Sequence, residues 1–78
     1  MIKISRNGFG YFLSRDNKNT PDIELAEYLE IPIKKYIKMM KKHNAIEKRN
    51  EYWFEIREDV ENFLTELEPY IILKVITN

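Results

Sequence analysis

Five lysines lie within nine residues near the middle of the chain, at spacings that place them on one side of an α-helix. They are Lys34, Lys35, Lys38, Lys41 and Lys42, and no acidic residue occurs between positions 33 and 46. Residues three, four and seven positions apart share a helix face, so these ammonium groups would form one basic surface. A helix face that only meets water usually alternates lysine with glutamate at a spacing of four. The unbalanced row therefore predicts binding to the phosphates of DNA or RNA, with a solvated surface as the alternative.

Charge is unevenly distributed along the 78 residues, although the formal net charge is zero. Between positions 33 and 49 there are seven basic residues and a single acid, Glu47. Positions 21 to 30 carry four acids and no base, and positions 51 to 68 carry seven acids against Arg57. Such a polarised molecule would steer a polyanion toward one of its faces.

Two kinds of contact are predicted for the basic helix. Lys34, Lys35 and Lys38, near its start, are placed to reach base edges, and Lys41 and Lys42 are placed to bind phosphates. Lysine acts mostly as a point charge, so much of the affinity would not depend on the DNA sequence. If each of the five neutralised one phosphate, the logarithm of affinity would fall with the logarithm of salt concentration at a slope of about −4.5.

Other residues near this helix have two interpretations each. Ile33 and Ile37 lie one turn apart and could contact thymine methyl groups, although packing on the N-terminal segment is the interpretation that we favour. Lys48, Arg49 and Asn50 form a polar, basic turn that could bind phosphate or simply be suited to a turn.

Turn-forming residues predict the elements that precede the basic helix. The segments Ile2 to Ser5 and Tyr11 to Ser14 are β-prone and flank Asn7-Gly8, a pair typical of hairpin turns. Thr20-Pro21-Asp22 has the residue order of a helix start, with a hydroxyl cap, a proline and an acid. A first helix is expected from there to about Glu30.

Proline and asparagine predict the limits of the basic helix itself. Pro32 breaks the chain and suits the first turn of a second helix, which would run to about His43, with Asn44 as a left-handed cap. The buried side of the two helices would be formed by Leu25, Ala26, Leu29, Ile31, Tyr36, Met39 and Met40.

A second hairpin is predicted after the basic helix, with strands over 45 to 48 and 52 to 56. A three-residue loop, Arg49-Asn50-Glu51, would place Ile46 opposite Phe54 on the inner face, with Ile56 also inward. Trp53 would then lie on the outer face, covered by the N-terminal segment or the tail, or stacked on a partner.

Helical spacing of Val60, Phe63, Leu64 and Leu67 predicts a third helix from Arg57 to Glu68, which Pro69 would end. The following apolar tail, residues 70 to 76, suggests a buried strand or a contact with a second chain. Its candidate interface residues are Ile71, Ile72, Leu73, Val75 and Ile76.

The order of these segments resembles the winged helix-turn-helix family. The stretch LAEYLEIPIKKYIKMMKKHNAI resembles the family's pattern of an LA pair, a leucine three residues after the alanine, a turn, a second helix and an isoleucine opening the wing. The stretch EKRNEYWFEIREDVENFL resembles the wing and closing helix of small phage and transposon excisionases and of MerR-type DNA-binding domains. The resemblance implies a second helix in the major groove and a wing on the backbone.

We therefore expect a single α+β domain over residues 1–78. It would comprise an N-terminal β arm (1–19), a helix-turn-helix (20–44), a wing (45–56), a closing helix (57–68) and the apolar tail (70–76). The expected function is binding of double-stranded DNA as a transcriptional regulator or recombination accessory factor, by a homodimer or cooperative array. A protein-interaction module of the same fold is the alternative, and RNA binding is a third interpretation.

The residue types do not favour other classes of function. The chain has no cysteine and one histidine, and it has no phosphate-cradling glycine loop or nucleophile-and-base pattern. We expect no enzymatic activity, cofactor, metal or small-molecule ligand. We also expect a cytoplasmic protein without membrane contact, since no apolar run is long enough to span a bilayer.

Overall fold

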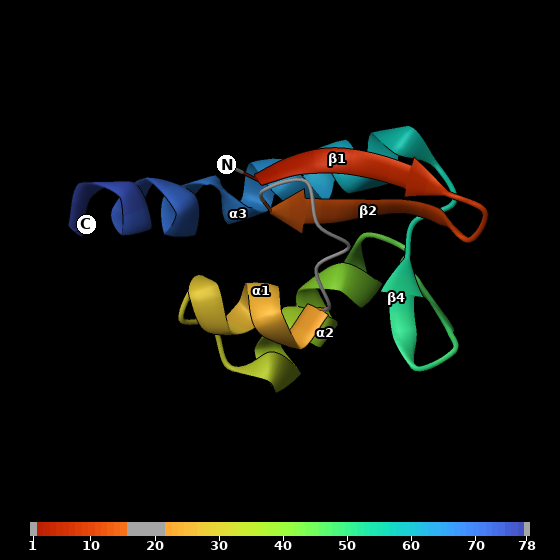
Figure 1. Ribbon diagram of the computed structural model, residues 1–78, viewed down its shortest axis with the longest axis horizontal. Helices are drawn as coiled ribbons and strands as arrows, with labels where there is room; N and C mark the ends of the chain where they lie inside the picture. Colours follow the sequence, from red (N-terminus) through yellow and green to blue (C-terminus); the bar gives the residue numbers. More distant parts are fainter. Residues whose placement is uncertain (1, 16–21, 78) are drawn as a thin grey trace.

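The protein is a small α+β domain, and the computed structural model describes residues 2–15 and 22–77. These residues form two antiparallel hairpins and three helices, and Figure 1 shows how the elements are arranged. In chain order they are β1 (Ile2–Asn7), β2 (Gly10–Arg15), α1 (Asp22–Tyr28), α2 (Ile33–Lys42), β3 (Ile46–Lys48), β4 (Glu51–Trp53) and α3 (Arg57–Thr77). The hairpins form two separate antiparallel sheets, β1-β2 and β3-β4.

The predicted N-terminal hairpin is confirmed, although its turn lies one residue later than Asn7-Gly8. Asn7 pairs with Gly10 at the end of the ladder, so the connection consists of Gly8 and Phe9. The Asn7 side-chain oxygen accepts a hydrogen bond from the Phe9 amide at 2.8 Å. This local bond fixes the turn because it gives the exposed Phe9 amide a partner within the turn itself.

The two short helices begin and end close to the predicted positions, and the break at Ile31-Pro32 is confirmed. The predicted cap at Thr20-Pro21 lies outside the described residues. Both helices end in a left-handed residue, Glu30 (φ 58°) after α1 and Asn44 (φ 68°) after α2, which confirms the role expected for Asn44. The next amide then donates to a carbonyl five residues earlier, Ile31 to Ala26 at 2.9 Å and Ala45 to Met40 at 3.1 Å.

The register of the second hairpin differs from the predicted one. Ile46 pairs with Trp53 rather than Phe54, because Arg49 and Asn50 alone form the turn, both with positive φ. Of the three residues expected to point inward, Phe54 is buried, whereas Ile46 is 40% exposed and Ile56 is 60% exposed.

The largest correction concerns α3, which continues through Pro69 to Thr77 as one helix. The tail is therefore neither a strand nor a separate segment. A proline lacks the amide that would donate to the carbonyl four residues earlier, but contacts beyond it favour the helix. Tyr70 and Ile71 pack against the core, and the Lys74 ammonium lies 5.3 Å from the centre of the Tyr28 ring.

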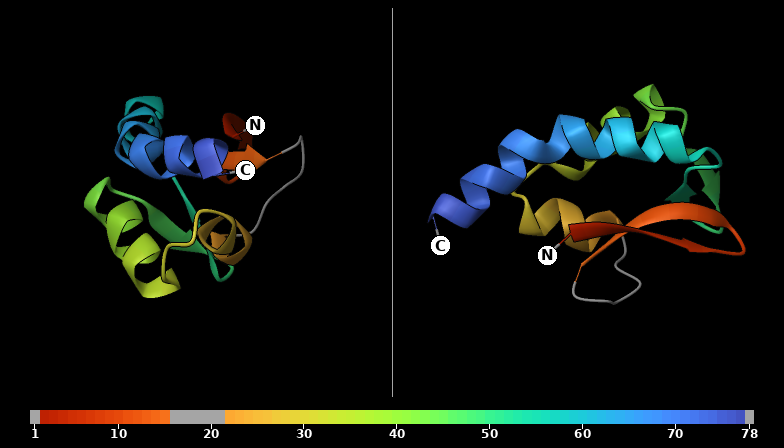
Figure 2. Two further views of the ribbon diagram at one scale, coloured as in Figure 1. Left: turned by 90° about the vertical axis from the view of Figure 1, so that its left-hand side faces the viewer. Right: turned by 90° about the horizontal axis from the view of Figure 1, so that it is seen from above.

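The core lies between α3 and the helix pair α1-α2, with the first hairpin closing one side. In Figure 1, α3 runs beside the β1-β2 hairpin and α1 and α2 lie below them, and Figure 2 shows α3 and this hairpin side by side when seen from above. Tyr36 of α2 and Phe54 both contact the Phe63 ring of α3, with centroid distances of 5.5 and 5.3 Å. The apolar set predicted for the first two helices is buried, as are Val60, Phe63 and Leu67. These contacts fix α2 by its inner side, which leaves its lysine side exposed.

Candidate nucleic-acid interface

All five lysines of α2 are exposed, while Tyr36, Met39 and Met40 on the opposite side are buried. The helix is therefore strongly amphipathic, with an apolar side in the core and a basic side in solvent. Lys35, Lys38 and Lys42 lie on the side of α2 that faces α3. Lys41 lies near Tyr52 of the second hairpin, and Ile33 and Ile37 lie beside the turn of that hairpin. We call the exposed lysines the basic face.

Four of these lysines have no carboxylate partner among residues 2–15 and 22–77. Lys35 and Lys41 instead lie near aromatic rings, with Nζ 5.5 Å from the centre of Tyr70 and 5.8 Å from that of Tyr52. Contacts of this kind at an exposed site leave the ammonium charge available. The positive potential of the basic face is thus largely uncompensated.

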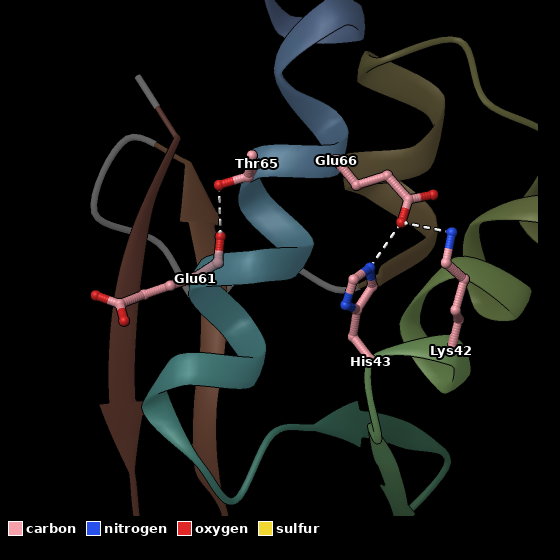
Figure 3. A network of polar contacts seen from close by, with 5 residues as sticks. All are labelled: Lys42, His43, Glu61, Thr65 and Glu66. Carbon is pink, nitrogen blue, oxygen red and sulfur yellow. Dashed lines mark hydrogen bonds and ion pairs between the residues drawn. The ribbon is translucent and has the colours of Figure 1, made fainter.

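Lys42 is the exception, because a carboxylate of α3 reaches across to it. Glu66 Oε1 lies 3.1 Å from Lys42 Nζ and 2.6 Å from His43 Nε2, and Figure 3 shows both contacts. The hydrogen bond with His43, together with Lys42, holds the pKa of Glu66 below its usual value despite some desolvation. His43, for which the sequence suggested no catalytic role, connects the end of α2 to α3.

At the tip of the second hairpin, the three predicted phosphate-binding residues have different environments. Lys48 Nζ donates to the Phe9 carbonyl at 3.1 Å and lies 3.7 Å from Glu55, so its charge is engaged within the protein. Arg49 and Asn50 are exposed, and the Arg49 guanidinium carbon lies 5.4 Å from the centre of the Phe9 ring. Arg49 and Asn50 are therefore better placed than Lys48 to contact a partner.

Trp53 is covered by the N-terminal hairpin, which is one of the arrangements that the sequence suggested. Its ring stacks on Phe9 at 5.2 Å between centroids and meets the Phe12 ring edge-on at 5.3 Å. Only 8% of the residue is exposed. Trp53 thus joins the two hairpins and is not a free stacking surface.

Ile33 and Ile37 line a surface hollow of about 350 Å³ between α2, the start of α1 and the turn of the second hairpin. The other lining residues are Asp22, Ile23, Arg49, Asn50, Glu51 and Tyr52. Ile33 and Ile37 are both partly buried and also pack against the hydrophobic core, and their packing on the N-terminal segment stays a prediction. Ile33 and Ile37 of α2 and the tip of the second hairpin therefore border the same hollow.

Two acidic residues of this region have roles that the sequence did not predict. Asp22 accepts a hydrogen bond from the Tyr52 amide at 3.0 Å, and burial raises its pKa to about 6. Glu66 pairs with residues of α2 more than twenty positions away. No periodic pattern could reveal either contact, since both depend on how distant elements pack.

Comparisons with protein-family models, with characterised proteins and with solved structures find no match to this chain. Within the described ranges, none of the helices combines the length and the apolar character needed to cross a membrane.

Proposed function

We propose that this protein binds double-stranded DNA as a small winged helix-turn-helix protein, acting as a transcriptional regulator or recombination accessory factor. In this proposal, α1 and α2 form the helix-turn-helix and the β3-β4 hairpin is the wing. The basic face of α2 enters the major groove, which is wide enough to admit a helix, and the wing contacts the flanking backbone.

The observation that supports this proposal most strongly is the uncompensated charge of the basic face. Lys34 and Lys38 are exposed on neighbouring turns, and no acid within the described part of the chain pairs with them. A phosphate approaching them would release counterions without first breaking an internal ion pair. Arg49 and Asn50 share the adjoining hollow with Ile33 and Ile37, so a duplex on α2 would also meet the hairpin tip.

A salt titration with random-sequence duplex DNA tests this proposal. The Lys34→Ala/Lys38→Ala variant should bind severalfold more weakly near ~50 mM salt. If each of these two lysines neutralises one phosphate, the slope of log affinity against log salt should also be shallower by about 1.8, at about 0.9 per contact. Both positions are exposed and alanine favours helix, so the fold should be retained.

The matched control removes two positive charges elsewhere. Arg6→Ala/Arg57→Ala changes the net charge equally, but both residues are exposed outside α2 and the second hairpin. In the control variant, the dependence of DNA affinity on salt concentration should have the same slope as in the original protein. Equal weakening by both double variants, or no binding by the original protein near ~50 mM salt, would contradict the proposal. Stronger binding to single- or double-stranded RNA would favour the RNA interpretation, and binding to neither nucleic acid would favour a protein-interaction module.

Self-association is part of the same proposal, because one domain of this size covers few base pairs. The end of α3 is the surface that we propose for it. Ile72, Leu73, Val75 and Ile76 are between 55% and 73% exposed, whereas Ile71 is partly buried against the core and contributes less. Contiguous exposed apolar side chains of this kind are typical of interaction surfaces.

A further inference from the structure

On the α3 side of the basic face, an acidic residue, Glu66, is paired with one of the lysines of α2. A hollow of about 290 Å³ between α2 and α3 is lined by Lys35, Lys38, Met39, Lys42 and Glu66. The three lysines are spaced by three and four residues and therefore stand above one another along one edge of α2. The side chains of these lysines line a hollow that is open to solvent, and the Lys42 ammonium at its edge lies 3.1 Å from Glu66. A phosphate group could bind Lys42 there if the carboxylate were absent.

Glu66 projects into this region from α3 and is held there by two partners. Figure 3 shows its carboxylate between His43 and Lys42, whereas Glu61, on the same helix, points away from α2. The side chain of His43 is 18% exposed and that of Lys42 is 65% exposed. Glu66 is therefore anchored by the more buried partner, and Lys42 is the partner that can exchange the carboxylate for another anion.

We infer that Glu66 is an intramolecular competitor of phosphate, which occupies Lys42 in the free protein and weakens nucleic-acid binding at the α3 side of the basic face. This inference rests on the proposed function and adds a residue that sets its affinity. When a phosphate reaches this hollow, Lys42 must leave Glu66, and the carboxylate stays beside the bound phosphate because His43 retains it. Both the broken ion pair and the like charge reduce affinity.

Glu66→Gln is the direct test, since glutamine keeps an oxygen for His43 but carries no charge. Binding to a random-sequence duplex should strengthen severalfold near ~100 mM salt, and the salt slope should steepen by about 0.9 as Lys42 gains a phosphate contact. Glu61→Gln is the matched control. It removes the same charge from the same helix, and Glu61 pairs with Arg57 rather than with α2.

A double-variant cycle separates the specific effect from the loss of one negative charge. Lys42→Ala should weaken binding little in the original protein, because Lys42 is already paired, but clearly in the Glu66→Gln background. The gain from Glu66→Gln should accordingly be mostly lost when Lys42 is alanine. Circular dichroism and denaturation midpoints would verify that each variant is folded, and Glu66→Ala provides a second neutral variant if glutamine disturbs His43.

The outcomes distinguish this inference from the proposed function. If Glu66→Gln and Glu61→Gln change affinity and slope equally, or if the gain persists in full with Lys42→Ala, Glu66 is not a competitor although DNA binding stands. If neither the original protein nor any variant binds the duplex near ~50 mM salt, both proposals fail. If DNA affinity increases in Glu66→Gln but not in Glu61→Gln, and the increase requires Lys42, the result supports both the proposed function and the competitor role of Glu66.

Discussion

Glu30 has a backbone conformation that its residue type disfavours. It ends α1 with a φ of 58°, in the left-handed region where glycine is unstrained and other residues are rarely found. Its side chain is 77% exposed and lies 3.6 Å from Lys74, an ion pair worth little in water. The backbone strain at Glu30 is therefore only slightly offset by its ion pair with Lys74.

Replacing Glu30 by glycine should stabilise the protein. We expect Glu30→Gly to raise the free energy of unfolding by about 1 kcal/mol, because the left-handed conformation is then unstrained. Urea denaturation measures this directly. Asn44→Gly is the matched control, because it changes the residue that ends α2 with a φ of 68°, and asparagine tolerates this region. Its effect should be clearly smaller, and an equal gain at both positions would contradict the explanation.

Asp22 should make stability depend on pH in an unusual direction for a carboxyl group. Burial raises its pKa from 3.8 to about 6. Between these values the folded protein holds a proton that the unfolded chain has released, so the contribution of Asp22 to stability falls as pH rises. Ionised Asp22 at neutral pH therefore costs stability.

The Asp22→Asn variant tests this contribution, because asparagine can still accept a bond from the Tyr52 amide. The two proteins should have similar stability below about pH 4, and the variant should become the more stable one as pH rises through 6. Denaturation midpoints of both proteins, measured at several pH values, would show this difference. Parallel curves for the two proteins would mean that Asp22 has an ordinary pKa.

Residue types also show how far local sequence can predict the backbone. Asparagine is common in left-handed caps, so the role of Asn44 could be predicted from its type and position. Glu30 and Arg49 adopt positive φ as well, although neither residue type favours it. Their conformations are set by the packing of the flanking elements, which is why the turn of the second hairpin was predicted one residue too long.

At the level of elements, the two hairpins are joined by backbone hydrogen bonds as well as by the Trp53 side chain. Tyr11 and Phe54 exchange backbone hydrogen bonds of 2.7 and 2.9 Å, and Gly10 has a φ of 137° beside them. A Cβ atom on Gly10 would lie 2.7 Å from the Phe54 carbonyl oxygen. Neither atom could turn away from the other, because each is attached directly to the main chain. Only glycine suits this position.

The variant Gly10→Ala should destabilise the protein by about 2 kcal/mol or more, since it adds both backbone strain and a clash with backbone. Gly8, in the same turn, provides the control. No heavy atom lies within 4 Å of a Cβ built there, so Gly8→Ala should be close to neutral. Thermal and urea unfolding of the two variants measure the contrast. A small effect of Gly10→Ala would show that the two hairpins are not held together at this point.

The length of α3 shows where helix prediction failed. Proline usually ends a helix, and the β-branched residues after Pro69 suggested a strand. Contacts made beyond Pro69 outweigh both tendencies, because Tyr70, Ile71 and Lys74 all lie against residues near α1 or the core. These contacts join parts of the chain that are some forty residues apart, so no local pattern could have predicted them.

For the molecule as a whole, the sequence predicted which sides of the helices are buried or exposed better than it predicted the contacts between elements. Helical periodicity located the buried side of α1 and α2 and the exposed lysines, because both follow from spacing within one element. The engagement of Lys42 by Glu66 and of Lys48 by Phe9 and Glu55 depends on packing between elements. The candidate interface is therefore smaller than the lysine count suggested.

The exposed end of α3 should govern oligomeric state. Ile72→Asp introduces a charge among the exposed apolar side chains and should shift a dimer to monomer, measured by light scattering during size-exclusion chromatography. Asn62→Asp introduces the same charge at another exposed position of α3 and should leave the state unchanged. A dimer that survives Ile72→Asp would exclude this surface, and an original protein that is monomeric at high concentration would contradict self-association.

The stacking of Trp53 between the hairpins has a practical consequence for following this protein in solution. It is the sole tryptophan of the chain, and its indole touches Phe9 and Phe12 close to the exposed Arg49 turn. Fluorescence excited at the long-wavelength edge of protein absorption, where tryptophan absorbs, therefore comes from a single site at the contact between the two hairpins. Its emission maximum reports whether the first hairpin remains docked, which gives an optical signal of local opening without any attached dye.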